Sequence, residues 1–219
     1  MQPRRNRRAR PDQTLAFYRR LRDEFEPGRP FWNTESADTA CGGNPWANTF
    51  FDTFRYLDQL GRLAKQEVSV VAHNTLVASD YGLLNDRTLE PKPNYWAALL
   101  WRRLMGSTVL EAGHPIREGM HLYAHCLRGA PGSVAVLAIN NSQTQPMSIE
   151  VPVEAERYTL TARQLDSSAV QLNGQELRWA ANGELPELRG QPIPAGRVEL
   201  APTSITFLMI PRARNENCR

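Results

Sequence analysis

The spacing of apolar residues changes near residue 107, and this change limits the folds open to the chain. Before it, segments with helical spacing alternate with short strand-like segments, which is typical of parallel βα units. A complete eight-stranded barrel needs about 250 residues, so we expect residues 11–107 to form the last βα units of a (β/α)8 barrel. The predicted order is helix, strand, helix, strand, helix, over residues 14–25, 31–34, 48–63, 68–73 and 95–105.

Local signals predict the ends and the buried faces of these elements. Asn48 or Thr49 is expected to cap the second helix, while Pro93 lies near the start of the third and Gly106 at its C′ position. The valine-rich segment 68–73 (VSVVAH) is expected to be a strand buried on both faces. The first helix has an apolar face made of Leu15, Tyr18, Leu21 and Phe25.

The second half, residues 108–219, consists of short alternating segments separated by turn residues such as GAPGS, NNSQTQP and LNGQ. None of them has helical spacing. This pattern predicts an antiparallel β-sandwich. The predicted strands are HLYAHCL, SVAVLAIN, MSIEV, RYTLTAR, ELRWA, VELAP and SITFLMI.

Charge and composition exclude several classes of function. The net charge is +3, but residues 1–10 contain five arginines, so the rest of the chain has a net charge of −2 (+3 less 5). A nucleic-acid interaction would therefore rest on this basic, disordered head alone, and we expect none. The paired arginines are not followed by an apolar segment, so we expect no signal peptide. No segment approaches the roughly 18 apolar residues of a membrane span.

The segment FWNTESADTACGGN, residues 31–44, contains the first candidate site residues. Glu35 follows a predicted strand, and in βα folds catalytic groups lie at the carboxyl ends of strands. A carboxylate there can act as nucleophile or as general acid/base; the alternative is an ordinary solvated glutamate. Gly42 and Gly43 precede a helix, where backbone N–H groups can bind an anion; the alternative is that they only permit a tight turn.

A second group of candidates follows the strand 68–73. His73 and Asn74 end this strand, so they are expected to face the same pocket as Glu35; the alternative for His73 is a structural role. Tyr81 lies on the next loop, where its hydroxyl could bind a polar ligand. Asp80 could do the same or could shape a turn.

Taken together and in order, NTESADTACGGN, FRYLDQLGRLA, HNTLVASDYGLL and PKPNYWAALLWRRLMGSTVL resemble the C-terminal half of heparanase-like enzymes, glycoside hydrolase family 79. The resemblance covers about residues 15 to 219. It implies the end of a (β/α)8 barrel, from about its sixth helix to its eighth, followed by a β-sandwich. It also implies hydrolysis of β-linked glucuronic acid glycosides with retention of configuration, which requires two carboxylates about 5–5.5 Å apart.

The resemblance assigns roles to the candidate residues. Glu35 matches the nucleophile, Gly42, Gly43 and Tyr81 match groups that hold the uronate carboxylate, and Asn74 matches an amide in the cleft. No cofactor or metal is expected. The intact protein is expected to be extracellular or periplasmic, although the chain shows no signal peptide.

The sequence also departs from the family pattern. Cys41 stands where animal members have tyrosine, which points to a bacterial-type enzyme. The acid/base glutamate of an Asn-Glu pair after the fourth strand is absent, and Asn215-Glu216 is rejected because it lies in no strand context. We therefore expect this chain alone to be incomplete and inactive.

The resemblance implies a disulfide between Cys126 and Cys218, as in animal members; the alternative is two unpaired thiols. The three cysteines fit no zinc site. Closing a loop of about 90 residues would stabilise the fold by roughly 4–5 kcal/mol, and the bond would indicate an oxidising compartment.

Two rival hypotheses remain at this point. The chain could be a catalytically inactive carbohydrate-binding or interaction remnant built on the β-sandwich. It could also be one part of a split enzyme, with the N-terminal half of the barrel supplied as a separate chain.

Overall fold

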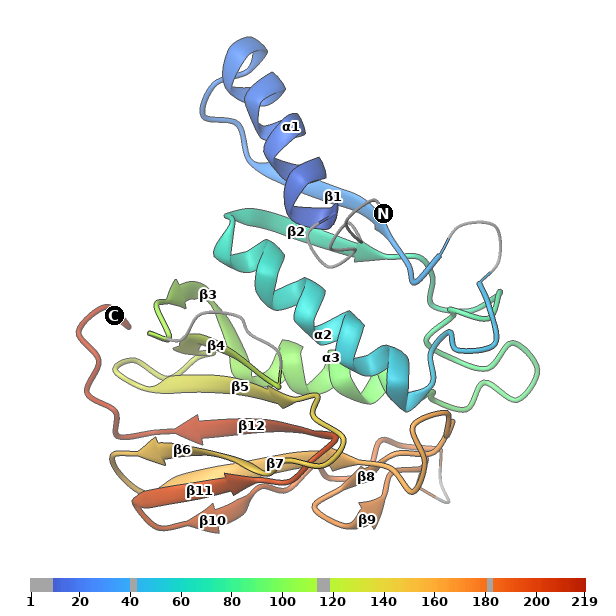
Figure 1. Ribbon diagram of the computed structural model, residues 1–219, viewed down its shortest axis with the longest axis vertical. Helices are drawn as coiled ribbons and strands as arrows, with labels where there is room; N and C mark the ends of the chain where they lie inside the picture. The colour runs from blue at the N-terminus through green and yellow to red at the C-terminus, as the bar shows by residue number, and fades with distance from the viewer. Residues whose placement is uncertain (1–9, 40–42, 114–118, 181–182) are drawn as a thin grey trace, which may run out of the picture.

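The computed structural model describes residues 10–39, 43–113, 119–180 and 183–219. In the first half, helices and strands alternate in the predicted order, and the two strands β1 and β2 pair in parallel (Figure 1). The elements are α1 (Arg10–Phe25), β1 (Phe31–Ser36), α2 (Phe50–Lys65), β2 (Val68–His73) and α3 (Pro93–Leu104). The predicted βα alternation is thus confirmed, while the assignment of these units to the end of a barrel remains a prediction.

The prediction that residues 68–73 form a strand buried on both faces is wrong for this chain. Val68 is buried in a small cluster with Leu15 and Leu63, but Val70 is 39% exposed. The reason is that β1 and β2 form a two-stranded sheet, and no further strand joins it within the described residues. The predicted apolar face of α1 is likewise left uncovered beyond Leu15, since Tyr18, Leu21 and Phe25 are exposed.

The second half forms one large antiparallel sheet and one small one. The large sheet has eight strands in the order β3-β4-β5-β12-β7-β8-β9, with β10 pairing beside β7. The small sheet contains β6 and β11. Their bounds are β3 (Met105–Leu110), β4 (Met120–Leu127), β5 (Val134–Asn140), β6 (Met147–Val151), β7 (Ala155–Thr161), β8 (Gln171–Leu172), β9 (Gln175–Glu176), β10 (Gln191–Ile193), β11 (Gly196–Leu200) and β12 (Ser204–Ile210).

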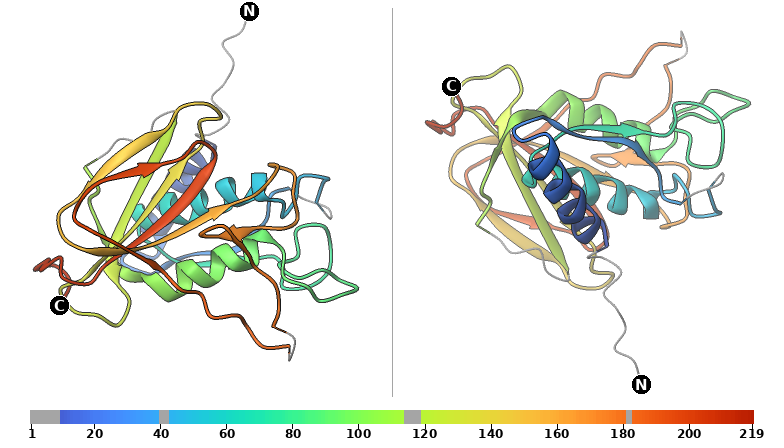
Figure 2. Two further views of the ribbon diagram at one scale, coloured as in Figure 1. Left: turned by 90° about the horizontal axis from the view of Figure 1, so that it is seen from below. Right: turned by 90° about the horizontal axis from the view of Figure 1, so that it is seen from above.

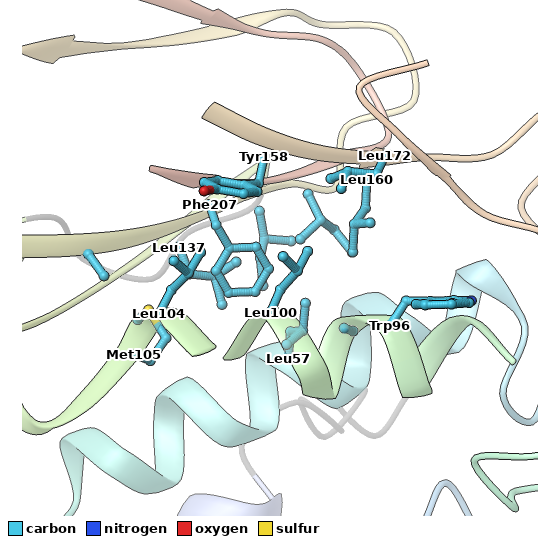
Figure 3. Close-up of a cluster of buried hydrophobic side chains, with 14 of the residues drawn as sticks. Leu57, Trp96, Leu100, Leu104, Met105, Leu137, Tyr158, Leu160, Leu172 and Phe207 are labelled. Carbon is cyan, nitrogen blue, oxygen red and sulfur yellow. The ribbon is translucent and has the colours of Figure 1, made fainter. Parts of the chain in front are cut away.

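The central strand β12 of the large sheet is buried on both faces, because its side chains contribute to two hydrophobic cores. Alternate residues of a strand point to opposite faces. Ile205 and Phe207 pack toward Leu57 and Leu100 of the helices in the main core (Figure 3). Leu208 and Ile210 belong to the second core, together with residues of β6 and β11. The large sheet therefore lies between the helices α2 and α3 and the small sheet, and α1 lies at the far end from the small sheet (Figure 1 and Figure 2).

Two local predictions fail because of tertiary contacts. ELRWA, residues 176–180, is not a strand, because β9 ends at Glu176 and so contains only its first residue. The Trp179 ring instead packs edge-on against Tyr95, and its Nε1 donates to the Leu89 carbonyl 3.2 Å away. These contacts draw the chain away from the sheet and toward α3.

Gly106 does not end α3 in the left-handed conformation expected at C′. Met105 is the C-cap, and Gly106 lies inside β3. A Cβ on Gly106 would lie 2.4 Å from the carbonyl oxygen of Cys126 on β4. The glycine is therefore needed for the close approach of two backbones.

The free backbone N–H groups at the N-terminus of α2 donate to carbonyls of the second half rather than to a capping side chain. Thr49 is the N-cap, as predicted, but its side chain makes no capping hydrogen bond. The backbone N–H groups of Phe50 and Phe51 donate to the carbonyls of Ser167 and Leu165, at 2.9 and 2.6 Å. These bonds attach the helix to the loop between β7 and β8.

Candidate functional site

The candidate site forms where β1 and β2 end. The two strands run in parallel, with Ser36 opposite His73, so their carboxyl ends meet at one edge. There the Asn74 side-chain amide donates to Glu35 Oε1 at 2.8 Å, and the Asn74 backbone N–H donates to the Ser36 carbonyl at 2.9 Å. The structure thus brings together Glu35 and Asn74, which are 39 residues apart in the sequence.

Glu35 points away from the helix that covers β1. The neighbouring Ser36 is buried, and its hydroxyl donates to Gln59 Oε1 of α2 at 3.1 Å. Glu35 instead is exposed to solvent, and its carboxylate meets Asn74 at the end of β2 rather than a residue of α2. A carboxylate oriented by one amide and open on its other side can attack an electrophile or exchange a proton.

Gly43, before α2, lies in space beside Asp80 and Tyr81 of the loop after β2. Gly43 has a φ of 101°, which L side chains rarely adopt. A Cβ there would lie 2.7 Å from the Asp80 Cβ and 3.3 Å from Tyr81 Cδ1. The glycine therefore serves both backbone conformation and close packing, which is compatible with a tight turn at Gly43; anion binding by its backbone N–H group stays a prediction. Gly42 and Cys41 lie outside the described residues.

The His73 ring contacts the Tyr81 loop and Tyr56. Its Nε2 lies 2.8 Å from the Tyr81 carbonyl, which can only accept, so Nε2 carries the proton. The ring also packs edge-on against Tyr56, with ring centroids 5.4 Å apart. Burial lowers the pKa of His73, which keeps the imidazole neutral. These contacts agree with the structural alternative for this histidine.

Asn48 is a residue whose role the sequence did not reveal beyond a possible cap. It is 1% exposed and has a φ of 53°, a conformation that asparagine tolerates better than most residues. Its side-chain amide donates to the carbonyls of Tyr81 and Gly82, and its Oδ1 accepts from the Asn94 backbone N–H at 2.9 Å. One buried side chain thus fixes the loop after β2 and the start of α3. The only sequence signal for this role is that asparagine adopts the left-handed backbone conformation more readily than most residues.

Buried charges hold the same junction from α2. Asp52 Oδ2 accepts from the Asn48 backbone N–H at 3.1 Å and from the Asn94 side-chain amide at 2.7 Å. Arg55 pairs with Asp52 at 2.5 Å. Hydrogen-bonded, paired charges are the form in which ions are tolerated inside proteins, so this network is suited to a rigid support for the Tyr81 loop.

Lys92 places a cation on the outer side of this loop. Its Nζ donates to the Asp80 carbonyl at 2.8 Å, and burial lowers its pKa. Asp80 itself is exposed. No sequence pattern singles out Lys92, because its contact with the loop depends on the fold.

The structure contains a disulfide between Cys126 of β4 and Cys218, with Cα atoms 5.2 Å apart. It closes a separation of 92 residues and attaches the C-terminal segment to the large sheet. Within the described ranges, no group of three or more His, Cys, Asp or Glu side chains is arranged to hold a metal ion. None of the helices described here is long and apolar enough to cross a membrane.

Comparison with known proteins found several curated relatives. Heparanase-like protein 1 of Arabidopsis thaliana is 31% identical over 237 residues, covering 89% of this chain and 43% of its own length. Baicalin-beta-D-glucuronidase of Scutellaria baicalensis is 34% identical over 175 residues, covering 75% and 33%. Inactive heparanase-2 of Homo sapiens is 30% identical over 220 residues, covering 89% and 37%. The chain thus spans less than half the length of each of these relatives.

Solved structures show the same fold at lower identity. A GH51 alpha-L-arabinofuranosidase from Thermotoga petrophila matches 91% of this chain and 48% of its own, with a TM-score of 0.66 and 14% identity. CelM2, a bifunctional glucanase-xylanase from a metagenome library, matches 91% and 34%, with a TM-score of 0.60 and 17% identity. No family model matches the chain. From the curated relatives, the chain belongs to the heparanase-like family, glycoside hydrolase family 79.

Proposed function

We propose that this chain is the C-terminal portion of a retaining glycoside hydrolase acting on β-linked glucuronic acid glycosides, with Glu35 as the nucleophile. The observation that carries the proposal is the Glu35–Asn74 hydrogen bond of 2.8 Å at the shared end of two parallel strands. Family membership supports a glycosidase, and barrel glycosidases have their catalytic groups at this end of the strands.

In the proposed reaction, Glu35 attacks the anomeric carbon and forms a glycosyl-enzyme, while the leaving oxygen takes a proton from a general acid. Water then attacks the intermediate, and Glu35 leaves as a carboxylate. Retention requires the second carboxyl group about 5–5.5 Å from the first. We propose that this acid/base lies on a part of the (β/α)8 barrel outside this sequence. The matched segments make up only 33–43% of the relatives' lengths, so the relatives contain further sequence that could carry it.

The uronate is proposed to bind beside Glu35, at the junction of the glycine loop and the Tyr81 loop. Backbone N–H groups of Gly42 and Gly43 and the Tyr81 hydroxyl would hold its carboxylate. The assignment does not rest on Lys92, because the Asp80 and Asp86 carboxylates lie near its ammonium group and offset its charge. The Asn48 network explains how such a loop would keep its geometry.

The test is covalent labelling with 2-deoxy-2-fluoro-β-glucuronyl fluoride. Fluoride departs without protonation, so the missing acid is not needed, and the 2-fluoro group slows hydrolysis of the intermediate. We expect intact-mass spectrometry to show one added glucuronyl group, mapped to Glu35 by peptide analysis and absent in Glu35→Gln. The matching glucosyl fluoride, which lacks the carboxylate, should label far more slowly. A label on another residue, or one that survives Glu35→Gln, would overturn the assignment.

A second candidate is a catalytically inactive glycan-binding protein. The 30% identity to inactive heparanase-2 favours it. Saturable binding of a glucuronide that is unchanged by Glu35→Gln, with no labelling, would support this function. The split-enzyme arrangement, with the N-terminal barrel half as a separate chain, is a further proposal that co-expression with an upstream reading frame would test. Export to an extracellular or periplasmic space likewise remains a proposal.

A further inference from the structure

A cavity of about 740 Å³ lies between α2 and one end of the large sheet. We call it the α2 cavity. Its volume falls within the roughly 300–1,000 Å³ of sites that bind small molecules. It is lined by residues of the β1–α2 loop, of α2 and of the sheet edge, among them Asp38, Trp46, Phe51, Gln59, Asn141 and Gln143.

The α2 cavity is lined by residues other than the proposed nucleophile. Gln59 lines the cavity and accepts the Ser36 hydroxyl, so this side of β1 faces α2. Glu35 does not line the cavity, and its carboxylate accepts instead from Asn74 at the end of β2. Neither Asn74 nor Tyr81 lines the cavity. The cavity is thus separate from the candidate catalytic site, although the two are connected through the end of β1.

Two aromatic rings are exposed at the cavity. Trp46 is 56% exposed and Phe51 is 53% exposed, and their rings meet edge-to-face with centroids 6.3 Å apart. Large aromatic side chains usually bury most of their surface in a monomer, and they dominate the energetics of binding sites where they remain open. A flat, apolar ligand face would remove this surface from water.

The polar groups of the α2 cavity are amides, carboxylates, two arginines and a histidine, and their charges are largely balanced. Arg55 pairs with Asp52 at 2.5 Å, and Arg62 pairs with Asp58 at 2.9 Å. Neutralised arginines offer little net attraction to an anion. The cavity therefore suits a neutral ligand rather than a uronate.

Within the part of the chain that the structure describes, one carboxylate oxygen of Asp38 has no hydrogen-bond partner. Its Oδ2 accepts from the Asn44 side chain, while Oδ1 is buried and has no hydrogen-bond partner among the described residues. Burial, with the nearby Asp52 carboxylate, raises the pKa of Asp38. Buried polar atoms without a partner are uncommon in folded proteins. Because Oδ1 is closed to solvent, the Asp38 carboxyl group would have to turn toward the cavity, and a ligand hydroxyl donating to it there would remove an unfavourable feature.

We propose that the α2 cavity binds an uncharged saccharide, with a pyranose ring against Trp46 and Phe51 and its hydroxyls on Asp38, Gln59 and Gln143. A pyranose has an apolar C–H face and a hydroxyl edge, which matches aromatic rings beside groups that accept and donate. Such a site would hold a neutral part of a glycan apart from the reacting bond. The inference does not depend on the role proposed for Glu35.

The test uses the full 219-residue chain and titration calorimetry with cellobiose, xylobiose, N,N′-diacetylchitobiose and glucuronic acid. We expect at least one neutral disaccharide to saturate with a Kd at or below about 1 mM. Trp46→Ala should weaken it by about tenfold or more. Trp32→Ala is the matched control, because Trp32 on β1 is 59% exposed and does not line the cavity; it should bind normally, as should Glu35→Gln.

Gln143→Ala tests whether the sugar is bound by polar groups of the cavity or only stacks on the exposed Trp46 ring. Gln143 is an exposed loop residue, so its truncation should leave folding intact and still weaken binding several-fold. The proposal is overturned if no neutral disaccharide saturates up to about 50 mM. It is equally overturned if binding is lost in Trp46→Ala but unchanged in both Gln143→Ala and Asp38→Asn, or if glucuronic acid binds the same cavity more tightly.

Discussion

Gly61 offers the sharpest test of the packing between α2 and the large sheet. This glycine is buried in the helix, and its Cα faces the ring of Tyr123 on β4. A Cβ at this position would lie 2.4 Å from two ring carbons and 2.5 Å from a third. Helix propensity alone predicts that Gly61→Ala stabilises the protein by about 1 kcal/mol, whereas the packing predicts the opposite sign.

The magnitude follows from what the ring would have to do. Carbon atoms in contact settle about 3.5–4.0 Å apart, so the Tyr123 ring must move by about 1 Å or more. The ring is 1% exposed, and its hydroxyl donates to Asp58 Oδ1 at 2.5 Å. Overpacking costs about 1–3 kcal/mol, and a weakened hydrogen bond to a carboxylate about 1.5–3 kcal/mol. After the gain in propensity, we expect a net loss of about 2–4 kcal/mol.

Urea unfolding, followed by far-UV circular dichroism and by tryptophan fluorescence, measures this change through the midpoint at constant m-value. Tyr123→Ala supplies the matched background, because it removes the ring carbons Cγ, Cδ1 and Cδ2 that the new methyl group would meet. In that background Gly61→Ala should be neutral or stabilising. An unchanged or raised midpoint in the parent protein, or the same loss in both backgrounds, would refute the reasoning.

Three further predictions concern stability. Cys218→Ser removes the disulfide to Cys126, which spans 92 residues. It should lower the free energy of unfolding, measured by urea titration, by about 4–5 kcal/mol. If a reductant does not change the stability of the parent protein, this prediction is wrong. Burial lowers the pKa of His125, so the unfolded chain binds this proton more readily and stability should fall as the pH drops below about 6.5. His125→Gln should flatten that part of a melting-temperature profile, and an identical profile would count against it. Burial raises the pKa of Tyr56 to about 12, so about 2–3 kcal/mol of stability should be lost as the pH rises from 10 to 12, and Tyr56→Phe should lose less over the same range.

The order of elements could be predicted because it depends on local periodicity. The helical spacing of residues 48–63 and the apolar segment 68–73 identify α2 and β2 within two residues of their observed ends. Glu35 and Asn74 could also be paired as candidates, since each was predicted to follow a strand and parallel strands end at one edge; β1 in fact extends past Glu35 to Ser36. The ends of β1 and β2 then bring them within hydrogen-bond distance.

Other features could not be predicted because their cause lies in distant residues. ELRWA has the composition of a strand, but Trp179 packs on Tyr95 across 84 residues of sequence and leaves the sheet. Gly106 has the position of a helix-ending glycine, but the Cys126 carbonyl decides its role. Asn48 looked like a cap, and only the folded chain places Tyr81 and Asn94 against it.

The sequence by itself determined the helices and strands of the first half, most strands of the second half, where carboxylate, amide and glycine residues lie at strand ends, and which family the motifs resemble. These are properties of neighbouring residues, and backbone dihedral preferences and apolar periodicity act over a few positions. Only the tertiary structure decided which faces are covered, that β12 is buried on both sides, and that Asn48 supports the Tyr81 loop. Those outcomes depend on contacts between residues tens of positions apart, which no local pattern records.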